Sequence, residues 1–172
     1  MSEDKLVSRT LRMPTSHLKR FEEEAKNRDL SFNAYVNQVH AKYLDFDLFV
    51  EGARPVVLSR ASLLSILNYP TKEQIEQAGI AAGSEVLSSL FTHYNIKPSL
   101  DSIITYYLRP MSKYSGWFAA RYYEDDRKIV LNHDKGIKWS HWLKGHEDSS
   151  LFSVLKTHPR IDLTSNSVIL HL

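Results

Sequence analysis

This sequence contains no cysteine among its 172 residues. Disulfides, thiolate zinc sites and cysteine nucleophiles are therefore excluded, and only histidines and carboxylates remain as metal ligands. No apolar run approaches the roughly 20 residues that a membrane span needs. The first five residues are polar and acidic, unlike a secretory signal. We therefore expect a cytoplasmic protein that does not enter a membrane.

Recognisable enzyme signatures are also lacking. The chain has only six glycines and no glycine-rich phosphate loop. No Ser-His-Asp order, paired-carboxylate motif or cofactor fingerprint stands out. Internal repeats and low-complexity tracts are missing too. We therefore assign no catalytic residue, expect no enzymatic activity and name no cofactor.

A substantial core is what the composition does provide. Hydrophobic residues make up 42% of the chain, with aromatic residues along its whole length, which fits one or two small folded domains. The net charge is only +2. Residues 1–44 contain eight basic and six acidic residues, so they account for this whole excess. Such a small charge is weak support for nucleic-acid binding, which must be argued from the sequence pattern.

Residues 5–14 alternate between apolar and polar side chains. The apolar set is Val7, Leu11 and Met13, and the polar set is Ser8, Thr10 and Arg12. A period of two is typical of a strand with one apolar face. Arg9 is the exception on the apolar side, where an unpaired guanidinium is costly to bury. Pro14 cannot donate a ladder hydrogen bond, so we expect the strand to end there.

Two amphipathic helices are expected to follow this strand. Thr15 or Ser16 can cap the first, whose apolar stripe is Leu18, Phe21 and Ala25. Residues 27–30 favour a turn, and Ser31 can cap a second helix that extends to Leu44. One strand and two short helices cannot close a core, and a lone strand has two unpaired edges. The pattern therefore predicts a dimer joined through an antiparallel ribbon.

This strand-helix-helix order resembles the ribbon-helix-helix family, to which Arc-like and MetJ-like repressors belong. The resemblance covers residues 8–44, about a quarter of the chain. It implies that the ribbon lies in the major groove of double-stranded DNA, where its outward side chains Ser8, Thr10 and Arg12 contact bases. It also implies a phosphate contact at the start of the second helix, at Ser31, Phe32 and Asn33. Such phosphate contacts position the protein without specifying a sequence.

The remaining residues predict a second domain, for which no family is recognised. We place the boundary near Leu48, with residues 1–47 binding DNA and residues 48–172 forming a sensor or oligomerisation domain. A connection is expected after Leu44, strands at 54–59, 117–123, 128–132, 160–163 and 167–172, and helices at 61–67, 71–94 and 137–155. A further helix should begin at Ser99 and be kinked or ended by Pro110. The whole is α+β, with helices packed on an antiparallel sheet.

Two side-chain groups in this second domain have competing interpretations. The histidines His133, His141, His146 and His158, with Asp134 or Glu147, offer nitrogen and oxygen ligands for a metal. Core or surface hydrogen bonding is the favoured alternative, so no metal ligand is assigned. The aromatic residues are candidates for either an effector pocket or core packing, and we favour the core: Trp117, Trp139, Trp142, Tyr106, Tyr107, Tyr122 and Tyr123.

The sequence as a whole favours a dimeric or higher-order DNA-binding transcriptional regulator. Its second domain would sense a small-molecule effector or set the assembly. Alternatives are an antitoxin-like protein that binds a partner through this domain, a metal-responsive regulator, and an enzyme or docking domain that uses the first segment only to dimerise. Salt-dependent DNA affinity discriminates the first hypothesis from the last. The operator, the effector and the sign of regulation are not encoded in any recognisable pattern.

Overall fold

The computed structural model describes residues 7–52, 55–123 and 127–172. The chain divides into two compact units, Met1–Tyr43 and Leu44–Leu172. The division falls after Tyr43, whereas the sequence placed the boundary near Leu48. Each unit is described by itself.

The first unit contains an extended segment and two helices, α1 (Thr15–Asn27) and α2 (Phe32–Lys42). Residues 7–14 form no strand within the single chain, and residues 5 and 6 of the expected strand lie outside the described residues. The expected cap of α1 by Thr15 or Ser16 is wrong. Pro14 is the N-cap residue, with no side-chain cap hydrogen bond, because its fixed φ and free carbonyl already suit a helix start.

The expected connection after Leu44 is helical instead. The π-helical segment η1 (Tyr43–Asp47) and α3 (Leu48–Glu51) follow α2 directly. Phe49 is buried here and stacks on Tyr94, with 5.7 Å between ring centroids. Tertiary packing of this kind outweighs the mixture of acidic and apolar residues that indicated a connection.

The expected strand at 54–59 is also wrong. Residues 55–59 have no regular secondary structure, and Arg54 lies outside the described residues. Helix α4 (Arg60–Leu67) follows and confirms the helix expected at 61–67. This β-prone run does not pair with a strand among the described residues, and its Val56 and Val57 side chains are exposed.

The middle segment contains the helix expected at 71–94 and the one expected to begin at Ser99. Thr71 and Gln74 form a capping box at the start of α5 (Lys72–His93). Ser99 caps α6 (Leu100–Ile103), which continues through the π-helical segments η2 (Ile104–Leu108) and η3 (Met111–Ser115). Pro110 does not end this helical stretch, since it lies between two π-helical segments with helical dihedral angles. The stretch ends at Gly116, whose φ of 70° favours glycine.

The expected hairpin and C-terminal strands form one antiparallel sheet. Its strands are β1 (Ala119–Tyr123), β2 (Lys128–Asn132), β3 (Arg160–Leu163) and β4 (Ser167–His171), in the order β1-β2-β4-β3. On one face, Ile129 pairs with Leu170 and Leu131 with Val168, and all four are buried. The turn at 124–126 lies outside the described residues.

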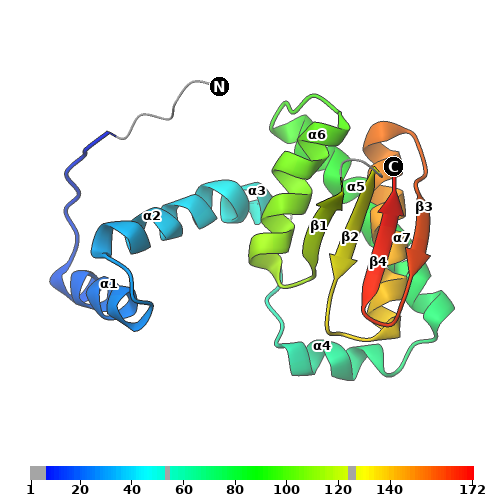
Figure 1. The fold of residues 1–172 in the computed structure, drawn as a ribbon, viewed down its shortest axis with the longest axis horizontal. Coiled ribbons are helices and arrows are strands. Elements are labelled where there is room, and N and C mark those ends of the chain that lie inside the picture. Colours follow the sequence, from blue (N-terminus) through cyan, green and yellow to red (C-terminus); the bar gives the residue numbers. More distant parts are fainter. Residues whose placement is uncertain (1–6, 53–54, 124–126) are drawn as a thin grey trace. The chain divides into compact units, whose positions relative to one another are not determined.

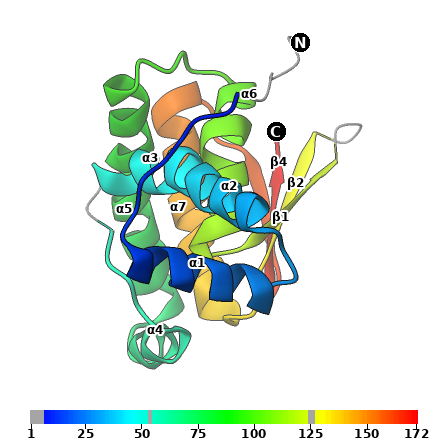
Figure 2. The same ribbon diagram turned by 90° about the vertical axis from the view of Figure 1, so that its left-hand side faces the viewer.

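Helix α7 (Ile137–Leu155) covers the apolar face of this sheet, with α5 beyond it (Figures 1 and 2). Three glycines hold α5 and α7 together at very short range. A Cβ on Gly79 would collide with the carbonyl oxygen of Trp142, and one on Gly145 with that of Glu76. Gly83 faces the carbonyl of His146 in the same way. The second unit is therefore α+β as expected, with sheet, α7 and α5 as successive layers.

A membrane-spanning helix is not found in the described part of the chain, where every helix is too short or too polar to cross a bilayer.

Candidate functional site

The residues expected to contact DNA bases lie in the extended segment before α1. Ser8, Thr10 and Arg12 are all exposed there. Val7 and Leu11, from the opposite alternation, are 69% and 65% exposed. Met13 is partly buried. The apolar side chains of this segment therefore have little cover within one chain.

The start of α2 is the second expected contact point. Ser31 caps this helix, its hydroxyl oxygen accepting the Ala34 N–H at 3.2 Å, as the sequence predicted. Asn33 is exposed, whereas Phe32 is partly buried against Phe21, with ring centroids 6.3 Å apart. Phe32 therefore contributes packing, and a phosphate contact there would have to use its backbone N–H.

The first unit has almost no core of its own. Phe21 also contacts Tyr35, with ring centroids 5.7 Å apart. Among residues 7–43, however, only Ala25 is buried. Two helices with one buried alanine do not remove enough apolar surface from water to offset the entropy of folding. Most apolar side chains in the described part of this unit are therefore left accessible to water within one chain.

The four histidines that the sequence offered as metal ligands do not converge. His141 Nδ1 lies 2.9 Å from Glu76 Oε2, and Lys144 donates to Glu76 Oε1 at 2.7 Å. These contacts link α7 to α5. Burial raises the pKa of Glu76, but these hydrogen bonds outweigh it and lower the pKa overall. Exposed His158 lies 2.9 Å from Asp148. Nowhere in residues 7–52, 55–123 and 127–172 do three His, Asp or Glu side chains meet as a possible metal site.

His133 has both ring nitrogens engaged at the end of β2. The Ser140 hydroxyl donates to the Thr164 carbonyl at 2.6 Å, so its oxygen accepts from His133 Nε2–H at 2.9 Å. His133 Nδ1 accepts the backbone N–H of Lys135 at 3.2 Å. This neutral tautomer leaves no lone pair for a metal. Burial first, and then the charge of Lys135, lower the pKa of His133 to about 4.

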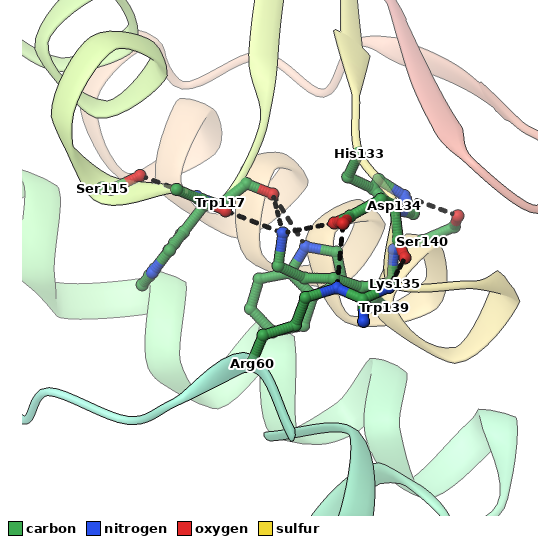
Figure 3. Close-up of polar contacts among 9 residues, drawn as sticks. Arg60, Ser115, Trp117, His133, Asp134, Lys135, Trp139 and Ser140 are labelled. Carbon is green, nitrogen blue, oxygen red and sulfur yellow. Dashed lines mark hydrogen bonds and ion pairs between the residues drawn. The ribbon is translucent and has the colours of Figure 1, made fainter. Parts of the chain in front are cut away.

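Next to His133, a lysine and an arginine join three segments of the second unit (Figure 3). The Lys135 side chain is only 10% exposed, and its ammonium donates to the Gly116 carbonyl at 2.7 Å and to Asp134 at 3.2 Å. Arg60 of α4 donates to the Asp134 carboxylate and carbonyl, both at 2.8 Å. The Lys135 hydrogen bond lowers the pKa of the Asp134 carboxyl. The sequence analysis did not single out Lys135 or Arg60, because nothing local shows that they meet.

The aromatic residues mostly pack in the core, as favoured. Trp139 and Trp142 stack with centroids 4.6 Å apart, and Trp117 meets both edge-on. His146 stacks on Trp142 at 4.7 Å. These rings therefore pack against one another, as core side chains do.

A fully buried carboxyl group lies beside this aromatic cluster. Tyr107 donates its hydroxyl to Glu147 Oε1 at 2.8 Å, and His146 Nδ1 lies 3.3 Å from the same oxygen. Burial, and then the charge of Glu147, raise the pKa of Tyr107 well above its ordinary value. Tyr107 therefore remains a hydrogen-bond donor. Glu147 Oε2 is buried without a hydrogen-bond partner in the described part of the chain.

One open groove of about 1070 Å³ lies elsewhere in the second unit. Its walls come from η1, α3, the end of α5 and the helical stretch 100–115. Its charged lining residues are of both signs: Asp45, Lys97, Asp101, Arg109 and Lys113. Tyr106 is one of the groove's lining residues. The groove is open rather than enclosed, unlike a typical small-molecule site.

Protein-family models, curated proteins and solved structures were all compared with this chain, and none of the three comparisons found a match.

Proposed function

We propose that this protein is a dimeric DNA-binding regulator whose residues 8–44 form a ribbon-helix-helix unit. The observation that supports it is the nearly coreless first unit, whose exposed Val7 and Leu11 alternate with polar side chains. Pairing the extended segments of two copies would pair one edge of each strand and cover these apolar residues at once. The polar side chains of the ribbon would then face outward.

This arrangement gives the outward side chains their roles. Arg12 is exposed, and its guanidinium can donate two hydrogen bonds to guanine in the major groove. The hydroxyl groups of Ser8 and Thr10 can form hydrogen bonds with several bases. The start of α2 at Ser31 and Asn33 provides backbone N–H groups and a positive dipole end for a phosphate. Two half-sites related by the dimer axis are expected in the operator.

The second unit would sense an effector or set the spacing of two such DNA-binding units. A ligand acts on this spacing only through different affinities for the two arrangements. The metal-responsive alternative loses its support, because the candidate histidines are engaged at separate places. No observation favours the antitoxin-like alternative.

The test is fluorescence anisotropy with a random duplex-DNA pool at low and moderate salt, followed by sequencing of the bound fraction. Arg12→Ala is compared with Arg20→Ala, which removes the same charge from the exposed face of α1. We expect both to weaken binding through lost charge, but only Arg12→Ala to abolish selection of a palindrome, a loss of about 1 to 3 kcal/mol of discrimination per contact. Intact protein without affinity even at low salt would refute the proposal.

A further inference from the structure

His146 and Glu147 are two ionisable side chains in the core of the second unit that the proposed function does not use. They are only 4% and 0% exposed. Glu147 Oε1 accepts the Tyr107 hydroxyl at 2.8 Å and lies 3.3 Å from His146 Nδ1, whereas Glu147 Oε2 is buried without a partner in the described part of the chain. A carboxylate in such surroundings is strongly unfavourable unless a positive charge compensates it.

The described elements around this pair bring no other positive charge to Glu147. The η2 segment contributes Tyr107, α7 contributes Ser150, and α5 contributes the carbonyl of Gly83. The charged residues that link α5 to α7 are paired among themselves: Glu76, His141 and Lys144. Among the described residues, Glu147 forms no ion pair with a lysine or an arginine. His146 is therefore the group that can compensate its charge.

The position of the His146 ring favours a positive charge. The ring stacks on the face of Trp142, with centroids 4.7 Å apart and planes at 24°, an arrangement that attracts a cation to the indole. Its Nδ1 can donate to Glu147. Its Nε2 has no partner among the described residues, where the buried side-chain atoms without a partner are Glu147 Oε2 and the Tyr122 hydroxyl oxygen. Water therefore reaches Nε2, so both N–H groups of an imidazolium can be hydrogen-bonded.

We propose that His146 is a buried imidazolium paired with the Glu147 carboxylate, and that this pair makes the packing of α7 against η2 sensitive to pH. Loss of the histidine proton leaves a buried carboxylate without a compensating charge beside Tyr107. An unfolded histidine releases its proton at about pH 6.5, whereas the paired one keeps it to higher pH. The pair contributes its full stability below that pH, and the contribution is lost as the pH rises. The pair belongs to the second unit alone, so this pH sensitivity does not depend on DNA binding.

NMR of the full-length protein with isotope-labelled histidine tests the charge directly, because the ring nitrogens of an imidazolium and of a neutral ring have different chemical shifts. We expect a histidine that is an imidazolium in wild type at about pH 8 and neutral in Glu147→Gln, which keeps an oxygen to accept from Tyr107. Asp148→Asn is the matched control. It removes a carboxylate from exposed His158, one position along α7, and should leave the His146 signal unchanged.

Thermal denaturation at about pH 7 and about pH 9 tests the consequence for stability. The melting temperatures of wild type and Asp148→Asn should fall by about 4 °C or more at the higher pH, and that of Glu147→Gln should change little. A wild-type His146 that is already neutral at pH 7, or an equal fall in wild type and Glu147→Gln, would overturn the proposal. If Glu147→Gln does not fold, sequential assignment of the wild-type spectrum gives the charge of His146 by itself.

Discussion

At the scale of single residues, the tertiary surroundings decide what an ionisable side chain does. His133 is one of four histidines that the sequence offers as metal ligands, yet both of its ring nitrogens are used by Ser140 and by the backbone of Lys135. Protonation of Nδ1 would replace an accepted hydrogen bond with repulsion between two N–H groups. The hydrogen-bond geometry and the lowered pKa of about 4 therefore agree on a neutral ring.

This neutrality makes the stability depend on pH. The unfolded histidine takes up its proton near pH 6.5 and the folded one only near pH 4, so the unfolded state binds more protons between these values. The free energy of unfolding should fall as the pH is lowered from 7 to 4, by about 1 to 2 kcal/mol because the ring is only half-buried.

Urea denaturation at several pH values checks this expectation. His133→Asn keeps an acceptor for the Lys135 N–H but cannot take up a proton. This variant should be less stable at pH 7 by about 1 kcal/mol, for the lost bond to Ser140. It should also show a smaller loss of stability in acid than wild type. An equal loss in both proteins would show that His133 does not carry the pH dependence.

At the scale of elements, the pairing of α5 with α7 depends on small residues. The sequence places Gly79 and Gly83 one turn apart in α5, and Gly145 lies in α7. These positions let the two helix backbones touch, so a methyl group has no space. Gly52, at the end of α3, has nothing within 4 Å of an added Cβ and a helical φ.

Alanine substitutions should separate these two situations. Gly79→Ala and Gly145→Ala each force the helices apart and should lower the free energy of unfolding by about 1 to 3 kcal/mol, despite the higher helix propensity of alanine. Gly52→Ala is the matched control and should be neutral or stabilising by about 0.4 to 1 kcal/mol. Thermal denaturation of the three variants is the measurement. Unchanged melting of Gly79→Ala would contradict the close approach.

At the scale of the whole molecule, the two units differ in what they can do alone. The second unit has its own core, centred on α7 and the sheet, with fully buried Leu131, Leu143 and Leu170. The first unit buries only Ala25 among its described residues. Its stability should therefore depend on a second copy, whereas that of the second unit should not.

A charge on the apolar side of the ribbon tests this difference. Leu11→Asp should prevent pairing and unfold the first unit, because a buried carboxylate without a partner is strongly unfavourable. Ser8→Asp, with the same charge on the outward side, should retain the dimer. Circular dichroism would report lost helix only for Leu11→Asp. Tryptophan fluorescence should be unchanged in both, since Trp117, Trp139 and Trp142 all belong to the second unit. Full helicity of Leu11→Asp would mean that the first unit folds without its partner.

The sequence by itself determined the elements that local chemistry specifies. Ser31 caps a helix as expected, because its hydroxyl accepts the backbone N–H of the residue three positions later. The hairpin strands and the helix at 137–155 were also predictable, from alternation and helical spacing over long stretches. The expectations at residues 45–52 and 55–59 and the cap of α1 were wrong, since short mixed or β-prone runs take whatever structure their neighbours allow.

Only the tertiary structure decided which distant residues meet. Arg60 reaches Asp134, Lys135 reaches Gly116, and α5 touches α7 through glycines, although nothing in the local sequence marks these pairs. The histidines were separated and the tryptophans gathered for the same reason, because packing fixes side-chain neighbours over long sequence separations. The ribbon and its base-contacting residues Ser8, Thr10 and Arg12 remain predictions of the sequence, since they depend on a second copy of the chain.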